Sequence, residues 1–427
     1  MKQMQNGVYS CDSCSYICTK SFKLKTTRSM TTKPAINKFA LFGLMFIPGF
    51  TWATWVTRTP VMRDVLNAST ETMGMILFGF SCGSMLGVLG AGKVINVLGI
   101  RKTMAGGFLL LLLGLLMLAA SLSIQSTPSA FMGLLIFGAG VGLVDIAINI
   151  EGAAFEQHLN KSLMTTLHGF FSLGTLVGAL TGMAMTAFGI NTTLHFVVAV
   201  ALSILTAIVL MRQMPWLSDL ARSEQEEKGD YKTQVFNELK DSRLLILGVV
   251  ILAMALAEGS ANDWLPLLMI DGHNFGHTSG TLVYVGFTAG MTLGRFAGGY
   301  FVDRFGKVNM LRFSAASAAL GLTLVIFSNA PLLAAAAVIF WGIGASLGFP
   351  LTISAAGSGE NSAVRVTIAA TLGYFAFLVG PPALGFLGEV AGLRIAMLPV
   401  LVMVILAFIC SSSARERSAR TASDTPS

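Results

Sequence analysis

GFSCGSMLGVLGAG, residues 79–92, has a second copy half a chain length later, GFTAGMTLGRFAGG at residues 286–299. The segments align without a gap, and one register pairs Gly79/Gly286, Phe80/Phe287, Gly83/Gly290, Leu86/Leu293, Gly87/Gly294, Gly92/Gly299 and Gly99/Gly306. Glycines alone could coincide in two membrane helices, but a single register at half the length indicates an internal repeat. Such repeats are typical of secondary transporters, which place a substrate site near the midplane between related halves.

The composition predicts a membrane protein. Hydrophobic residues make up 54% of the 427 residues, and charged residues make up 11%, compared with roughly 25% in a soluble domain. Each crossing needs ~20 apolar residues. Apolar runs that could cross lie at 39–57, 72–95, 103–123, 129–155, 163–189, 193–211, 244–266, 279–302, 308–328, 331–355, 366–389 and 394–411. We therefore expect an all-α membrane protein with 12 transmembrane helices in two pseudo-symmetric six-helix bundles.

The basic residues predict the orientation of these helices. If both termini lie on one side, the loops on that side hold all but four of the 28 Lys and Arg residues. Arg58, Arg63 and Arg394 fall on the other side, and Arg295 lies within a span. The positive-inside rule then places the N and C termini in the cytoplasm of a multi-pass protein of the bacterial inner membrane. The net charge of +7 is thus a topology signal, and we expect no nucleic-acid partner.

One long polar interruption divides the chain. We expect a cytoplasmic linker over 213–243 between an N-terminal bundle at 39–212 and a C-terminal bundle at 244–412. Cytoplasmic tails are expected at 1–38 and 413–427. Within the linker, the stretch from Asp230 to Lys240 could form a short surface helix.

The N-terminal tail carries Cys11, Cys14 and Cys18. A closed zinc or iron–sulfur site needs four ligands, and no nearby His or Cys completes this set. We therefore expect neither a metal nor a cofactor. The sequence MTTKPAINKF from Met30 looks like an ordinary start before the first helix, so whether residues 1–29 belong to the native protein is open.

The segment GGYFVDRFGK, residues 298–307, resembles the cytoplasmic loop motif of the major facilitator superfamily, roughly G-x-x-x-D-R-x-G-[RK]. The matching residues are Gly299, Asp303, Arg304, Gly306 and Lys307. The first-half copy keeps Gly92 and Gly99 but has Asn96 and Val97 where the family has Asp and Arg. The resemblance covers about residues 38–412. It implies that this loop is a gating element, whose charges pair and lock the cytoplasmic side in one state, and that Gly299 permits close contact with the helix at 366–389.

A narrower likeness lies in DIAINIEGAAFEQHLNKSLMTTLHGFFSLG at 145–174 and in ANDWLPLL at 261–268. Both segments are similar to a bacterial branch of the superfamily that includes rhizopine-permease-like proteins and other inner-membrane transporters. In the first segment the likeness rests on Asp145, Asn149, Glu156, His168, Gly169, Ser172 and Gly174. This likeness implies a sugar- or cyclitol-like polyol as the transported solute.

Asp145 and Asn149 lie on a glycine-rich stripe of the helix expected at 129–155. Intervals of three and four residues join Gly138, Gly142, Asp145, Asn149 and Gly152, which places them on one face. Asp145 falls near the midplane, where a charge costs at least ~2.5–3.5 kcal/mol. The stripe either joins two helices through a polar pair or lines a water-filled cavity. We favour the cavity, because Ser or Thr would join helices at a lower cost.

The stretch LAEGSANDWLPLL, residues 256–268, also brings polar groups into an apolar helix. Glu258 and Asn262 are four residues apart and share a face. Asp263 points elsewhere, just before Trp264 and Pro266, which mark the expected outer interface. We therefore expect Asp263 to be a snorkelled or capping acid.

These positions supply candidates for transport chemistry. A buried carboxylate can take up and release a proton, so Glu258 and Asp145 are the candidate proton-coupling groups. We favour Glu258 slightly for the proton, and Asp145 with Asn149 and Asn262 for hydrogen bonds to substrate hydroxyls. Arg295 either pairs with an acid or snorkels.

Further candidates lie on other helices. Trp52 and Trp55 are either interfacial anchors or faces on which a sugar ring stacks, and Tyr374 is another candidate for substrate binding. His168 is placed at the cytoplasmic gate near Glu151 or Glu156, as a hydrogen-bond partner or as a proton relay.

The leading functional hypothesis is a secondary transporter that takes up a small polar solute by alternating access and proton-coupled symport. The sequence has no P-loop and no enzyme signature, so the proton gradient is the expected energy source. We expect a monomer in the lipid bilayer. Two alternatives stay open: efflux of drugs or metabolites by proton antiport, and a membrane sensor built on a transporter fold.

Overall fold

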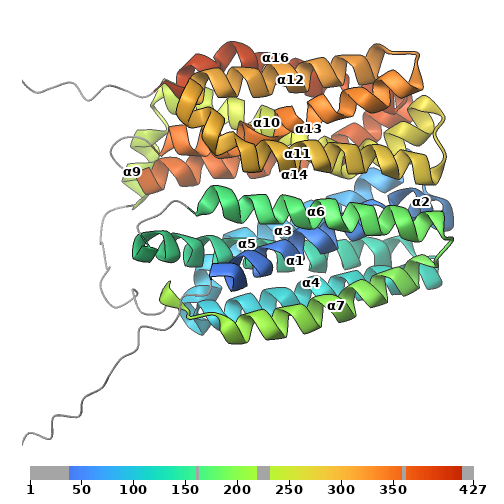
Figure 1. Ribbon diagram of the computed structural model, residues 1–427, viewed down its shortest axis with the longest axis horizontal. Coiled ribbons are helices and arrows are strands. Elements are labelled where there is room, and N and C mark those ends of the chain that lie inside the picture. The colour runs from blue at the N-terminus through green and yellow to red at the C-terminus, as the bar shows by residue number, and fades with distance from the viewer. Residues whose placement is uncertain (1–37, 160–162, 219–230, 358–361, 416–427) are drawn as a thin grey trace, which may run out of the picture. The chain divides into compact units, whose positions relative to one another are not determined.

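The computed structural model describes residues 38–159, 163–218, 231–357 and 362–415. The three tail cysteines and the possible start at Met30 lie outside these residues. The first half of the described chain consists of helices α1 (Lys38–Val56), α2 (Thr59–Leu66), α3 (Thr70–Leu98), α4 (Ile100–Ser123), α5 (Thr127–Leu159), α6 (Met164–Ala187) and α7 (Thr192–Gln213). These helices run back and forth beside one another (Figure 1).

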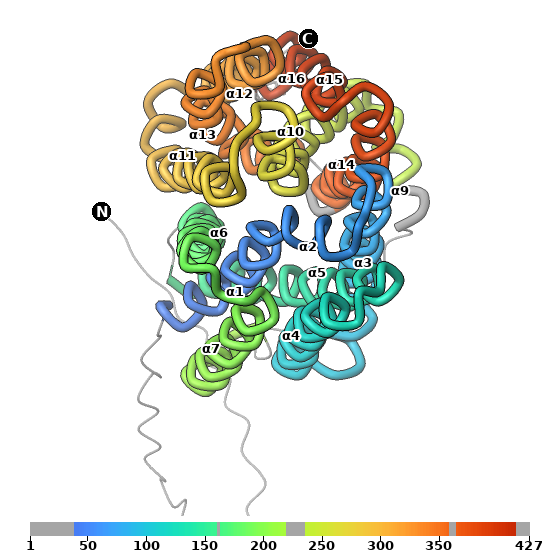
Figure 2. The backbone as a smooth tube through the Cα atoms, turned by 90° about the vertical axis from the view of Figure 1, so that its right-hand side faces the viewer, coloured from blue at the N-terminus to red at the C-terminus, as the bar shows by residue number. Residues whose placement is uncertain are grey.

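The second half repeats this arrangement. It consists of α10 (Ser242–His273), α11 (His277–Phe305), α12 (Lys307–Phe327), α13 (Pro331–Ala356), α14 (Ser362–Ala391), α15 (Leu393–Ala396), α16 (Leu398–Cys410) and the 3₁₀ turn Ser411–Ala414. The short helix α9 (Tyr231–Glu238) precedes it, where the sequence allows a surface helix. Figure 2 shows α1–α7 on one side and α10–α16 on the other.

Each of the twelve predicted apolar runs falls on a helix, and the last falls on α15 and α16 together. Within the described residues, eleven helical segments are long and apolar enough to cross a membrane by length and composition. The helix outside that set is α11, which is rich in Gly and Thr and carries Arg295, and which occupies the place of α3 in the second half. The predicted fold class of twelve helices in two related bundles is therefore confirmed.

Two local features confirm the repeat. Gly99 and Gly306 have φ of 82° and 79°, and each both ends one helix and begins the next. Only glycine adopts this backbone conformation readily. Gly83 packs against the backbone of α5 at Leu135, and Gly290 packs in the same way against α13 at Ile339.

Two helix pairs form the main packing between the halves, α6 with α11 and α3 with α14. In the second pair, a Cβ at Gly74 would lie 3.0 Å from the Cα of Gly385, so glycines allow the two backbones to meet. The sequence assigned such a contact with α14 to Gly299, and this was wrong. A Cβ added at Gly299 would meet nothing within 4 Å of the described chain. Gly299 lies near the end of α11, which packs against α6 of the first half, whereas α14 packs against α3.

Ionic contacts join the halves at the end that the basic residues assign to the outside. Arg63 of α2 pairs with Asp271 of α10, and Asp64 Oδ2 lies 3.3 Å from His277 Nε2 of α11. The carboxylate of Glu389 also accepts the backbone N–H of Thr70 at 2.8 Å, at the start of α3. Helix N-termini favour anions. Helix α2, which was not predicted, therefore supplies two of these contacts.

Candidate substrate and proton site

A central cavity of about 130 Å³ lies between the halves. Of the residues proposed from the sequence, Trp52, Asp145, His168, Glu258 and Tyr374 line it. They come from α1, α5, α6, α10 and α14, so segments far apart in the chain meet at one site. Asn149, Asn262 and Trp55 do not line this cavity among the residues described.

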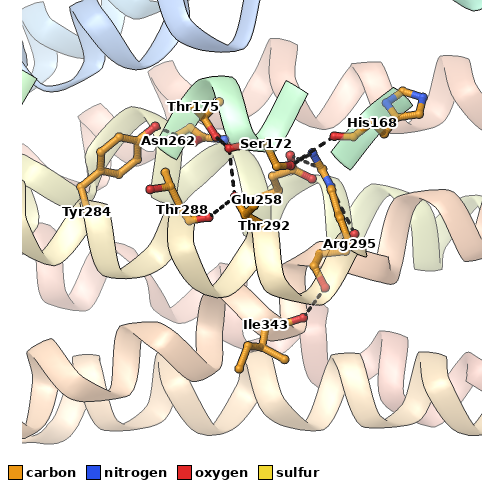
Figure 3. A network of polar contacts seen from close by, with 11 residues as sticks. His168, Ser172, Thr175, Glu258, Asn262, Tyr284, Thr288, Thr292, Arg295 and Ile343 are labelled. Carbon is orange, nitrogen blue, oxygen red and sulfur yellow. Dashed lines mark hydrogen bonds and ion pairs between the residues drawn. The ribbon is translucent and has the colours of Figure 1, made fainter. Parts of the chain in front are cut away.

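Glu258 forms an ion pair with Arg295. The Nη2 of Arg295 donates to Glu258 Oε1 at 2.7 Å, and the two residues are 7% and 8% exposed. Arg295 Nη1 also donates to Ser172 Oγ of α6 at 2.6 Å, so the network joins both halves (Figure 3). Of the two alternatives for Arg295, pairing with an acid is the one that the structure shows. The guanidinium balances the charge of Glu258 inside the protein.

Asp145 has different surroundings. Tyr374 donates its hydroxyl to Asp145 Oδ2 at 2.9 Å, and Asn149 Nδ2 donates to Asp145 Oδ1 at 3.0 Å. Both donors are neutral, and the described residues give Asp145 no ion pair. The Tyr374 bond also joins α14 to α5 across the halves. Because Asp145, unlike Glu258, has no balancing cation among the described residues, the geometry favours Asp145 over Glu258 for the proton, whereas the sequence slightly favoured Glu258.

Both asparagines form hydrogen bonds with other residues of this protein. Asn149 directs its amide to Asp145 and to the backbone carbonyl of the same residue, at 3.0 and 2.8 Å. Asn262 is 5% exposed, and its Oδ1 accepts the hydroxyl of Tyr284 at 3.0 Å (Figure 3). Asn149 thus contacts Asp145 within α5, and Asn262 contacts Tyr284 of α11.

Asp263 is not a snorkelled or capping acid, as the sequence predicted. It is 4% exposed and lies inside α10, which continues through Pro266 to His273. Proline within a membrane helix is tolerated where neighbouring groups compensate for its missing N–H. The expected helix end at 266 was therefore wrong, and with it the interfacial position of Asp263.

The two tryptophans of α1 separate in the structure. Trp52 lines the cavity, with its ring centroid 4.5 Å from that of Phe80 and 6.0 Å from that of Phe171. Trp55 is 0% exposed and packs between Phe80 and Phe137 inside the first half. Trp55 is therefore neither an interfacial anchor nor a cavity residue, because its face of α1 is covered by α3 and α5.

His168 lines the cavity together with Glu258 and Arg295, deeper than the gate position expected for it. Its two expected neighbours contact other segments. Glu151 accepts the backbone N–H of Leu217 at 2.5 Å, and Glu156 accepts that of Met164 at 2.9 Å. These two acids bind backbone N–H groups of cytoplasmic loop segments. His168 belongs instead to the central site.

The residues of the loop motif lie at the cytoplasmic end. Gly299, Asp303 and Lys307 line a cleft of about 410 Å³ between α6, α11 and α13. Arg304 donates to the hydroxyl of Tyr300 at 3.3 Å, and Gly306 has the positive φ described above. In the first half, Gly92 and Asn96 are exposed. Asp303 makes no ion pair with the described residues, and the charge lock that the motif implies stays a prediction.

Several members of the site are not among the site residues proposed from the sequence. Ser172 joins the halves twice, since its Oγ accepts from Arg295 and its backbone carbonyl accepts the hydroxyl of Thr292 at 2.9 Å. Phe349 and Phe377 line the cavity from α13 and α14. Ser172 is one of the residues on which the narrower likeness rests, but the sequence assigned no role to it. Nothing in the sequence distinguishes these two phenylalanines from the 29 present.

Two related six-helix halves that enclose a buried polar cavity define a membrane transporter. The chain belongs to the Major Facilitator Superfamily, whose family model matches residues 40–363 and 268–426. An uncharacterized MFS-type transporter of Yersinia pestis is 28% identical over 356 residues, which cover 82% of this chain and 88% of the relative. Membrane protein MosC of Rhizobium meliloti is 29% identical over 367 residues, covering 84% and 86%.

A solved structure shows the same fold at much lower sequence similarity. The nucleoside transporter NupG superimposes with a TM-score of 0.68 at 15% identity, over 89% of this chain and 99% of that chain. This likeness supports the arrangement of helices. The transported solute and the coupling ion are therefore inferred from the residues that line the cavity.

Proposed function

We propose that this transporter takes up a small, neutral, polyhydroxylated solute, sugar- or cyclitol-like, together with a proton across the bacterial inner membrane. The observation that carries the proposal is the contrast between two acids in one cavity. Glu258 is balanced by Arg295 at 2.7 Å, whereas Asp145 is held only by the neutral donors Tyr374 and Asn149. Protonation of Asp145 would leave the whole site neutral.

The cavity lining supports a neutral polar cargo. Its charged groups are an internally balanced pair and one acid, so they offer no uncompensated cation or anion once Asp145 is protonated. Trp52, Phe171 and Phe377 provide aromatic faces against which the apolar side of a sugar ring packs. Pockets for drug-sized ligands measure ~300–1,000 Å³, whereas this cavity measures about 130 Å³. The small volume favours a small solute over drug efflux.

Coupling follows from the position of Asp145 between the halves. Its carboxylate accepts the Tyr374 hydroxyl from the opposite half, at 2.9 Å. A cargo hydroxyl that takes the place of Tyr374 at Asp145 would break this link, and a proton on Asp145 would remove the charge that must otherwise be moved through the membrane. Cargo and proton together therefore ease the change between conformations.

The test is uptake by proteoliposomes that contain the purified protein. A panel of radiolabelled pentoses, hexoses and inositols is offered with and without an inwardly directed proton gradient. We expect one or more of these solutes to accumulate, and to do so only with the gradient. Movement out of the vesicles against the gradient would favour the antiport alternative, and indifference of every solute to the gradient would refute proton coupling.

A further inference from the structure

A second and larger cavity, of about 810 Å³, lies at the outer end of the protein. Both halves line it, since α2 and the ends of α4 and α6 meet the start of α11 there. It shares no lining residue with the central cavity. Its polar lining includes Ser123, Thr186, Asn191, Thr193, Thr278 and Ser279, and no Asp or Glu occurs among the described residues that line it.

Arg58, between α1 and α2, is the arginine in this lining and carries a positive charge. It is 3% exposed. Its Nε donates to His195 Nδ1 at 3.3 Å, and its Nη2 donates to the backbone carbonyl of Ile190 at 3.1 Å. Arg63, Arg295 and Arg365, by contrast, each pair with a carboxylate. The described part of the chain supplies Arg58 with no acid.

This arrangement is unusual for a buried cation. Buried charges are normally paired, and burial lowers the pKa of Arg58. His195 does not supply the missing negative charge. Because its Nδ1 accepts from Arg58, its proton sits on Nε2, which is buried and has no hydrogen-bond partner in the described residues. The described surroundings of Arg58 therefore supply no negative charge to balance its guanidinium.

We propose that this outer cavity binds an oxyanion, a phosphate or carboxylate group, through Arg58. Guanidinium groups bind such anions by charge-assisted hydrogen bonds, and Nη1 of Arg58 makes no hydrogen bond to the described residues. Because both halves line the cavity, a bound oxyanion stabilises the conformation in which the outer end is closed. The oxyanion belongs either to a soluble solute or to the headgroup of a lipid in the outer leaflet, and both present the same chemistry.

The test uses the purified full-length protein in neutral detergent and inorganic phosphate as the probe. Isothermal titration with sodium phosphate is compared with sodium chloride at equal ionic strength. We expect saturable phosphate binding that weakens about tenfold or more in the Arg58→Gln variant, since a hydrogen bond to a charged group is lost.

Arg394→Gln is the matched control. Arg394 also lies at the outer end and lines a cavity, but that cavity includes Asp271, and backbone carbonyls of Ile326 and Ser328 accept from its guanidinium at 2.8–3.0 Å. Phosphate binding should be unchanged in this variant. Equal loss in both variants would overturn the assignment to Arg58.

A lipid source is tested in nanodiscs of phosphatidylglycerol and of phosphatidylcholine. If phosphatidylglycerol alone raises the unfolding temperature of the wild type and of Arg394→Gln, but not that of Arg58→Gln, a headgroup supplies the oxyanion and the proposal holds. Absence of both saturable phosphate binding and this lipid effect in the wild type refutes it, whether or not Arg58→Gln folds. Neither readout depends on transport.

Discussion

Replacing Glu258 by Gln would leave Arg295 as a buried guanidinium without its carboxylate. The charges lie 2.7 Å apart and the side chains are 9% and 11% exposed. At an effective dielectric constant of about 20, the Coulomb attraction is roughly 6 kcal/mol. Desolvation of both ions offsets part of it, and breaking one partner of a buried pair typically costs about 3–5 kcal/mol. Ser172 still accepts from Arg295 at 2.6 Å, so we expect a loss near the lower end, about 3 kcal/mol.

The double variant Glu258→Gln/Arg295→Gln removes both charges and should recover much of this loss. The assay is equilibrium unfolding of the purified protein in mixed micelles of neutral and denaturing detergent, for the wild type, both single variants and the double variant. We expect a coupling energy of about 2 kcal/mol or more between the two positions. Single losses that add to within about 0.5 kcal/mol would show that the pair does not act as a unit.

Three further outcomes are expected. Gly306→Ala should lower the free energy of unfolding by about 1–3 kcal/mol in the same assay, because its φ of 79° strains any side chain. Gly299→Ala should not lower it, since open space surrounds Gly299. Equal losses in the two variants would contradict this expectation. Ser84 lines the central cavity and can report its opening to the outside. Arg63→Ala should increase labelling of Ser84→Cys by an external impermeant maleimide up to about fivefold, in a background without native cysteines, because a partly exposed ion pair contributes at most about 1 kcal/mol. Tyr374→Phe should lower the solute concentration for half-maximal uptake up to about tenfold, because the cargo hydroxyl no longer has to displace a hydrogen bond to a charged group. A half-maximal concentration equal to that of the wild type would rule out this displacement in the transport cycle.

The helices could be predicted because the membrane imposes a simple rule on sequence. A crossing needs ~20 apolar residues, and the twelve runs satisfied it. The rule fails where a helix lies outside the apolar layer or extends beyond it. Helix α2 is eight residues long and amphipathic, and α10 continues past Pro266 to His273. Asp263 was misplaced for this reason.

The acids of the site could be predicted from the high cost of charge in lipid, which makes Asp145 and Glu258 stand out in any apolar helix. Their partners could not be predicted. Tyr374 reaches Asp145 from the other half, and Arg295 reaches Glu258 from the next helix. These pairings depend on how the helices rotate against one another, which a single sequence does not contain.

Helix rotation also determines which of the two tryptophans lines the cavity. Trp52 and Trp55 are three residues apart on α1, yet one lines the cavity and the other is enclosed by Phe80 and Phe137. An interval of three residues places side chains on neighbouring, not identical, parts of a helix surface. The boundary between cavity and core passes between them, and its position is set by α3 and α5.

The central claim is that Asp145 carries the proton and that Glu258 does not. It is tested most directly by the pH change that follows addition of a transported polyol to lightly buffered proteoliposomes without any imposed gradient. The account predicts that the external medium becomes alkaline with the wild type and that Asp145→Asn, which keeps the shape of the side chain, abolishes this change while still exchanging labelled for unlabelled polyol. An alkaline shift of wild-type size in Asp145→Asn would contradict the account.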